Sequence, residues 1–296
     1  MRVILFTFWG RRENVELQLP YLQRILEENP NVEVHGWDLC RDQTGADSKY
    51  LSSINIDRLT VRTEFRPTNG KASRAQVRVW RYYASPEFAD CLFVKLDDDV
   101  LFLETDKFAD FVDTATRYPS HVISALTVNN GASTPHIPAL AQWFLDSNIP
   151  LRNDSLLDVH LYADYAHACH EWFITNWQTL IDSQGLIPTT DWVSINAIAM
   201  THSTLQRIAR LLDTQHPKVV AGRQQRILGD EGAANMQPRI IHKGFIAGHL
   251  TFGPQCDPKR PEREPGVRIL TPNELTKFRK GYADIAEQYL CPASAS

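Results

Sequence analysis

The chain has 296 residues and a formal net charge of −4, with 43% hydrophobic and 22% charged residues. This composition is ordinary for a globular protein, and the length suits one large domain with a sizeable core. The small negative charge does not indicate a nucleic-acid binder, and no apolar run reaches the length of a membrane span. The five cysteines show no paired spacing, so we expect a reduced cytoplasmic chain without disulfides or a membrane anchor.

The first half of the chain alternates apolar strands with amphipathic helices. We expect strands at residues 3–8, 32–37, 59–63, 91–96 and 122–126, and helices at 14–28, 71–83 and 108–117. This alternation predicts an α/β fold with a mostly parallel central sheet that is flanked by helices. Ligands of such sheets bind beyond the carboxyl ends of the strands, so functional residues should follow the strands directly.

The second half is less regular. It predicts a helix rich in aromatic residues at 156–181, a strand at 192–200, a helix at 203–212, and one or two strands within 239–252. Proline and charged residues dominate 253–266, which predicts an exposed loop. Thr271, Pro272 and Glu274 have the spacing of a helix N-cap, so a terminal helix is expected to run to about Tyr289.

Three consecutive acids, Asp97, Asp98 and Asp99, follow the apolar run that ends at Leu96. Unpaired charges at the end of a buried strand are costly to desolvate, so a cation is expected beside them. Side chains alternate along a strand, which places Asp97 and Asp99 on one face and Asp98 on the other. Two carboxylates on one face suit Mn²⁺ or Mg²⁺, and such an ion commonly binds a diphosphate as well. A solvated acidic turn is the alternative interpretation.

The segment from Ala89 to Phe111 resembles the DxD region of glycosyltransferases with the GT-A fold. The ordered set of motifs over residues 3–255 is similar to the bacterial and bacteriophage members of that class. The resemblance implies a GT-A-like domain at 1–255, with a nucleotide-sugar-binding half at about 1–126 and an acceptor-binding half at 127–255. Residues 256–296 would form a C-terminal extension with the terminal helix, and the tail beyond Pro258 has no counterpart in the resemblance.

The loop after the first strand is the first candidate for donor binding. Thr7 and Phe8 end that strand, and Arg11 and Arg12 follow in the loop. An arginine there can pair with a phosphate, and the start of the next helix offers free N–H groups to an anion. A pair of surface arginines is the alternative interpretation.

Further donor contacts are expected after the second strand and on the helix at 71–83. Asp38 follows the second strand, where the resemblance places an acid against the base or ribose, and a turn cap is the alternative. Arg74, Arg78 and Arg81 share one helical face, and Arg74 is the preferred donor contact. A solvated helix face would explain the same spacing. Asp98, together with Asp97, completes the expected donor set.

Asp230 and Glu231 lie between two glycines at the start of a short predicted helix. Acids stabilise a helix N-terminus by themselves. The resemblance gives one of the two the role of general base, which deprotonates the acceptor hydroxyl in an inverting transfer, and Asp230 is preferred.

His249 lies in an apolar segment downstream of both acid motifs. The resemblance makes it the third metal ligand beside Asp97 and Asp99, with His242 as the fallback, although a buried core histidine would show the same pattern. Asn129, Asn130 and Gly131 form a turn, or a loop that contacts sugar hydroxyls.

The resemblance as a whole implies a metal-dependent glycosyltransferase of a bacterial or phage-infected cell. It would move a sugar from a nucleoside-diphosphate sugar to a hydroxyl group, with UDP favoured as the nucleotide and inversion as the stereochemical outcome. The acceptor stays open between a hydroxylated phage DNA base, a protein and a polysaccharide. A metal-dependent phosphohydrolase or nucleotidyltransferase, and a non-catalytic sugar- or nucleotide-binding protein, are the alternatives from other classes.

Overall fold

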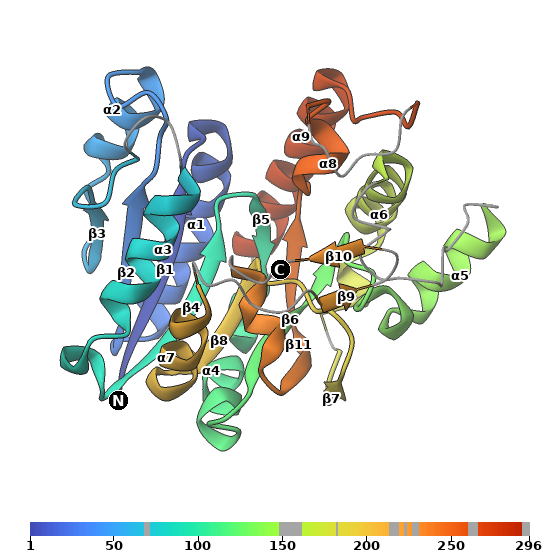
Figure 1. The fold of residues 1–296 in the computed structure, drawn as a ribbon. Helices are drawn as coiled ribbons and strands as arrows, with labels where there is room; N and C mark the ends of the chain where they lie inside the picture. Colours follow the sequence, from blue (N-terminus) through green and yellow to red (C-terminus); the bar gives the residue numbers. More distant parts are fainter. Residues whose placement is uncertain are drawn as a thin grey trace, which may run out of the picture.

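Helices cover both faces of one large mixed sheet in the computed structural model (Figure 1). It describes residues 1–67, 72–147, 162–181, 183–212, 219–221, 224–226, 231–259 and 266–291. The strands of the large sheet are β1 (Arg2–Trp9), β2 (Val32–Asp38), β3 (Leu59–Arg62), β4 (Cys91–Asp97), β5 (Val100–Leu103), β6 (Val122–Val128), β7 (Leu186–Thr189), β8 (Ala197–Thr201) and β11 (Arg239–His249). A separate antiparallel pair consists of β9 (Val219–Ala221) and β10 (Gln224–Arg226).

The α-helices that surround the sheet are α1 (Arg12–Glu28), α2 (Ala46–Ser53), α3 (Ala72–Tyr83), α4 (Phe108–Arg117), α5 (Pro138–Asp146), α6 (Ala163–Asn176), α7 (His202–Leu211), α8 (Gly253–Cys256) and α9 (Pro272–Leu290). A 3₁₀ helix, η6 (Glu231–Met236), precedes β11. Among the described residues, no helix combines the length and the apolar character needed to cross a membrane.

The strand order is β3-β2-β1-β4-β8-β6-β11-β5, and β7 pairs with β11 beside this path. Strands β3, β2, β1 and β4 run parallel, as do β6 and β11, whereas β8, β5 and β7 run antiparallel to their neighbours. The sheet is therefore mostly parallel, as expected. The carboxyl ends of β1, β2, β4, β6 and β11 all lie at one edge of the sheet. The candidate site residues that follow β4 and end β11 lie at this edge.

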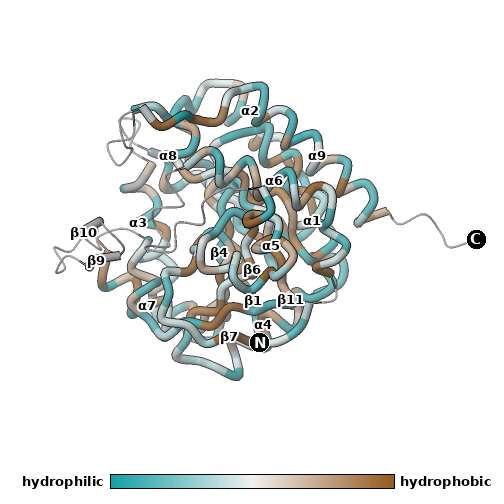
Figure 2. Tube along the Cα trace, turned by 90° about the vertical axis from the view of Figure 1, so that its right-hand side faces the viewer, coloured by the Kyte–Doolittle hydropathy of each residue, from teal (hydrophilic) through white to brown (hydrophobic). Residues whose placement is uncertain are grey.

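The alternation of side chains along β1 explains why the sheet is covered on both sides. Val3 and Leu5 belong to a core cluster with residues of α1 and α9, while Ile4 and Phe6 belong to a second cluster with residues of α3 and α7. A strand that is apolar on both faces must be buried on both, which is typical of parallel sheets. Figure 2 shows hydrophobic stretches gathered in the interior and hydrophilic stretches along outer elements such as α2 and α9.

The sequence located most elements of the first half but missed others. It did not predict α2, α5 or the strand β5. The expected strand at 192–200 is wrong at its start, because β8 covers only Ala197–Thr201. In the expected helix at 156–181, residues 156–161 lie outside the description, and the described part holds α6 followed by a 3₁₀ turn. The expected loop at 253–266 begins instead with the short helix α8.

The terminal helix α9 is confirmed, and it packs on the core. Thr271 caps it in a capping box with Glu274, as its spacing predicts. The Tyr289 ring stacks on Tyr21 of α1 at a centroid distance of 6.3 Å, and the Arg24 guanidinium donates to the Tyr289 carbonyl at 3.2 Å. The helix thereby covers the face of the sheet that α1 also covers.

A buried histidine in β2 links the stability of the fold to pH. The Nδ1 atom of His35 lies 2.6 Å from the Tyr83 hydroxyl, which also accepts the Trp37 indole N–H at 3.0 Å. His35 and Trp37 therefore both hydrogen-bond the Tyr83 hydroxyl, and the burial of the His35 ring favours its neutral form. Burial, followed by the charges of Arg62 and Arg2, lowers the pKa of His35 to about 4.

We expect His35→Asn to reduce the loss of stability in acid. A histidine in the unfolded chain has a pKa of about 6.5. Between pH 6.5 and pH 4 the unfolded chain therefore binds a proton at residue 35 and the folded chain does not, so the free energy of unfolding falls as the pH falls. His35 should account for about 3 kcal/mol of this loss. Urea unfolding of both proteins at pH 7 and pH 4 measures it. An equal loss in the variant would show that His35 does not titrate in this way.

Candidate functional site

The ends of β4 and β11 bring together two acids and a histidine from distant parts of the sequence. One ligand atom from each of Asp97, Asp99 and His249 lies within 4.8 Å of the other two. The three side chains come together because β5, which follows the acids, runs antiparallel to β11 and pairs with it. This pairing places His249 opposite Val100. The Leu250 amide then donates to the Asp99 carbonyl at 2.8 Å and fixes the two segments.

The imidazole of His249 faces the acids. Its Nε2 atom lies 3.2 Å from Asp99 Oδ1, and its Nδ1 atom is buried without a hydrogen-bond partner among the described residues. The ring packs against Phe252 at a centroid distance of 4.4 Å. A histidine that is buried in this position, with one nitrogen at the carboxylates, matches the geometry of a metal ligand.

A buried polar network holds the backbone that carries His249. Asn129 exchanges two hydrogen bonds with the Gln255 side chain, at 2.9 and 3.0 Å, and its amide also reaches the Leu250 carbonyl at 3.3 Å. His170 donates from Nε2 to the same carbonyl at 2.6 Å, and its Nδ1 atom lies 2.9 Å from the Tyr282 hydroxyl. Asn129, which has a left-handed φ of 66°, therefore stabilises the backbone next to His249 through its hydrogen bonds.

All three acids are expected on a strand, but β4 ends at Asp97, and Asp98 and Asp99 lie in the turn that follows, so strand alternation does not set the direction of Asp98. Asp98 is not one of the three converging ligands. It accepts the Gly10 amide at 3.1 Å and is gripped by Arg11, whose Nε lies 3.1 Å from Oδ2 and whose Nη2 contacts Oδ1. The same Nη2 atom lies 2.9 Å from Asp99 Oδ2. Arg11 thus bridges two of the three acids.

A fully buried lysine lies on the other side of Asp97. The Nζ atom of Lys95 is 2.6 Å from Asp97 Oδ1, 3.0 Å from the Ile195 carbonyl and 3.7 Å from Glu231 Oε2. The other Glu231 oxygen accepts the Trp80 indole N–H at 2.6 Å. Lys95 therefore lies between the acid run and the acid pair that the sequence singled out downstream.

The carboxylates outnumber the cations at this point of the molecule. Burial, together with the nearby charges of Glu231 and Asp99, raises the pKa of Asp97 to about 7 despite Lys95. Burial also disfavours ionised Asp99, but His249 and Arg11 outweigh it and hold the pKa of Asp99 well below its usual range. Burial is the largest cause of the raised pKa of Asp97, and the charges of Glu231 and Asp99 add to it, so a further cation beside Asp97 would lower that pKa.

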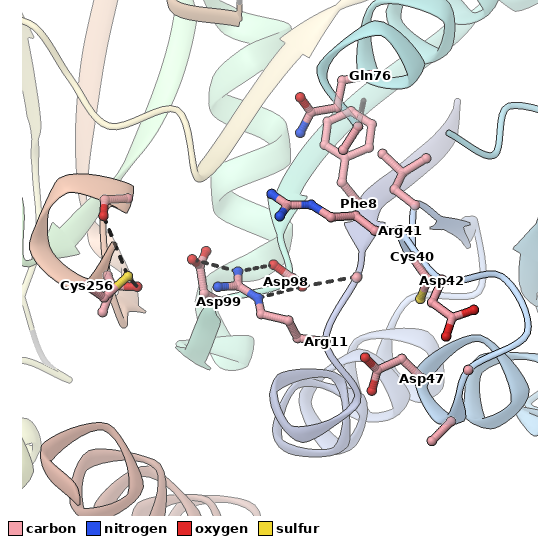
Figure 3. Close-up of a pocket in the computed structure, with 17 residues that line it drawn as sticks. Phe8, Arg11, Cys40, Arg41, Asp42, Asp47, Gln76, Asp98, Asp99 and Cys256 are labelled. Carbon is pink, nitrogen blue, oxygen red and sulfur yellow. Dashed lines mark hydrogen bonds and ion pairs between the residues drawn. The ribbon is translucent and has the colours of Figure 1, made fainter. Parts of the chain in front are cut away.

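A cavity of about 900 Å³ opens beside the acids (Figure 3). Asp98, Asp99 and Arg11 form one wall, and Cys256 lies across the opening from Cys40 and Asp42. The lining residues are Phe8, Gly10, Arg11, Leu39, Cys40, Arg41, Asp42, Gly45, Ala46, Asp47, Ala72, Gln76, Asp98, Asp99, Thr251, Gly253 and Cys256. The volume suits a ligand of nucleotide size.

The loop after β1 contributes only part of the expected donor contacts. Phe8 and Arg11 line the cavity. Thr7 is buried beneath it, with its hydroxyl 3.4 Å from Gln18 Oε1. Arg12 points elsewhere, because its guanidinium pairs with Glu16 at 2.6 Å.

Two other donor candidates also lie away from the cavity lining. Asp38 is fully buried, and its carboxylate is occupied by Ser48 at 2.6 Å and by Arg66. It therefore holds the loop after β2 in place and offers no free oxygen to a base or ribose. Arg74 is exposed on α3, and the residues of that helix that line the cavity are Ala72 and Gln76.

Of the candidate bases, only Glu231 can be placed, since Asp230 lies outside the described residues. The fallback ligand His242 is not near the acids of the run. Its Nε2 atom lies 3.0 Å from Asp110 Oδ2, and its Nδ1 atom accepts the Phe245 amide at 3.0 Å. Both ring nitrogens of His242 are thus engaged elsewhere in the fold.

Neither the protein-family models nor the curated proteins that were compared with the chain gave a match. The chemistry of the residues is therefore the basis for a functional proposal. The donor set of two carboxylates and one imidazole fits Mn²⁺ or Mg²⁺, and the fit is supported by the four carboxylates that lie around only two lysine and arginine side chains.

We expect Lys95→Met to destabilise the protein by about 3 kcal/mol in EDTA. The ammonium is completely buried, and its removal leaves Asp97 and Glu231 facing each other without a cation. Urea unfolding measures the change, and Lys277→Met, which removes an exposed lysine that pairs with Glu171, is the control. A change as small as that of the control would mean that Lys95 does not hold the acids together.

Proposed function

We propose that this protein is a metal-dependent glycosyltransferase of the GT-A type, which uses a nucleoside-diphosphate sugar as donor and a hydroxyl group as acceptor. The observation that carries the proposal is the convergence of Asp97, Asp99 and His249 beside a cavity of about 900 Å³. These are the ligands that the sequence resemblance named, and they come from the end of β4, the turn after it and the end of β11. UDP is the first nucleotide to test, and cytoplasmic location belongs to the same proposal.

Asp97, Asp99 and His249 would hold Mn²⁺ or Mg²⁺ at the carboxyl edge of the sheet. The bound ion would supply Lewis-acid stabilisation of the departing diphosphate. Arg11 lines the cavity beside these ligands, and its guanidinium fork suits phosphate oxygens. The nucleoside would lie between Phe8 and the loop after β2.

Glu231 is the proposed general base. Trp80 and Lys95 fix its carboxylate, and 15% of its side chain is exposed. In the transfer, the acceptor oxygen forms a bond to the anomeric carbon while the bond to the diphosphate oxygen breaks, and Glu231 takes the hydroxyl proton. Attack from the face opposite the diphosphate inverts the configuration. The acceptor itself is left open among a hydroxylated DNA base, a protein and a polysaccharide.

A nucleoside diphosphate should raise the melting temperature only when Mn²⁺ is present. A ligand at about 100 times its dissociation constant stabilises the folded state by roughly 2.7 kcal/mol, which is a shift of several degrees. Asp99→Asn should abolish the shift, and Asp57→Asn, at an exposed acid, should not. A panel of UDP, GDP, ADP and dTDP, each with and without EDTA, makes the measurement. Melting-temperature shifts that persist both in EDTA and in the Asp99→Asn variant would contradict a metal–diphosphate site.

Glu231→Gln should lower the rate of transfer by about 10²–10⁴-fold and leave binding of the nucleoside diphosphate intact. The assay follows release of nucleoside diphosphate from the donor that the panel identifies, with Glu87→Gln at an exposed acid as the control. Release of phosphate or nucleoside monophosphate would instead identify a phosphohydrolase or nucleotidyltransferase. Binding without turnover for every acceptor class would identify a non-catalytic protein.

A further inference from the structure

The guanidinium of Arg11 occupies a carboxylate oxygen that belongs to the candidate metal site. Its Nη2 atom lies 2.9 Å from Asp99 Oδ2, while Asp99 Oδ1 faces His249 at 3.2 Å. Asp99 is only 7% exposed, and each of its two oxygens faces one of these groups of the protein. A cation of the protein itself therefore already shares the acid that a metal ion would use.

We propose that Arg11 competes with the divalent ion for Asp99, and that a diphosphate ends this competition, so that ion and diphosphate bind cooperatively. This inference rests on the proposed function and adds to it a form of regulation. Arg11 would act as a positioning residue that keeps the site weak for the metal until the donor arrives.

The charges around the site support competition. Four acids, Asp97, Asp98, Asp99 and Glu231, lie around two cations, Lys95 and Arg11. When all four acids are ionised and His249, which faces Asp99, is neutral, two negative charges remain. A divalent ion neutralises that remainder, whereas loss of Arg11 leaves three negative charges for it. The site without Arg11 should therefore attract the metal ion more strongly.

A second position, in the cavity, is also available to the Arg11 side chain. Its side chain is 43% exposed, lines the cavity and comes from the loop between β1 and α1. Lys95, in contrast, is completely buried and cannot leave Asp97. When a diphosphate enters the cavity, Arg11 can pair with its oxygens and release Asp99. Because coupling between two ligands is reciprocal, metal and diphosphate must then strengthen each other's binding.

Titration with Mn²⁺ alone, followed by electron paramagnetic resonance of the free ion, tests the competition. Arg11→Gln should bind Mn²⁺ about tenfold more tightly than the natural protein. The control is Arg12→Gln, which makes the same change at the next residue, where the guanidinium pairs with Glu16 and not with the acid run. It should stay within about twofold of the natural protein. Equal or weaker binding by Arg11→Gln, in a variant that melts cooperatively, would overturn the inference.

A second titration with UDP present tests the cooperativity. UDP should increase the affinity of the natural protein for free Mn²⁺ by a larger factor than it does in Arg11→Gln, with at least a fivefold difference between the factors. Equal factors would reject the role of Arg11 and leave the proposed function standing. Absence of Mn²⁺ binding by the natural protein, with or without UDP, would reject the proposed function itself.

Nitrogen-15 spectra of arginine side chains give a readout that does not depend on a folded variant. Bound to Asp98 and Asp99, the Nε–H of Arg11 should exchange slowly with water and give a sharp signal. Saturation with Mg²⁺ and UDP should shift that signal, while the signal of Arg12 stays in place. A signal of Arg11 that does not move would overturn the inference.

Discussion

Excess negative charge at the carboxyl edge of the sheet is the constraint on which the rest of the site depends. The run from Asp97 to Asp99 brings more carboxylates than Lys95 and Arg11 can neutralise, and burial raises the pKa of Asp97 to about 7. A fold that keeps such charge needs both internal cations and space for another cation. The buried lysine and the bridging arginine meet the first need, and His249 helps to define the second.

The architecture places these groups through strand pairing rather than through local sequence. The short strand β5 turns back from the acids and pairs with β11, so that the last residue of β11 arrives beside Asp99. Asn129, Gln255 and His170 then hold the segment after His249 through buried hydrogen bonds. In metal sites, hydrogen bonds of this kind orient the residues that coordinate the ion.

The sequence predicted most elements of the first half of the fold, but not α2 or β5, because the signals of the others are local. It also singled out Asp97, Asp99 and His249, whose side chains the structure brings together. An apolar run that ends in acids reveals the end of a strand. The alternation expected for the three acids does not apply, because β4 ends at Asp97 and the other two acids lie in the turn after it. The partners of Asp38, by contrast, depend on Arg66 and Ser48, which only tertiary packing brings near. For the same reason, the sequence did not predict that Arg11 bridges Asp98 and Asp99, or that Asn129 hydrogen-bonds the segment after His249.

The central claim is that Asp97, Asp99 and His249 together bind a divalent ion. Crystals soaked with Mn²⁺ and UDP, measured at the manganese absorption edge, test it most directly. The account predicts one strong anomalous peak within coordinating distance of all three side chains, at about 2.0–2.3 Å. A peak at other residues, or none at this edge of the sheet under saturating Mn²⁺ and UDP, would contradict it.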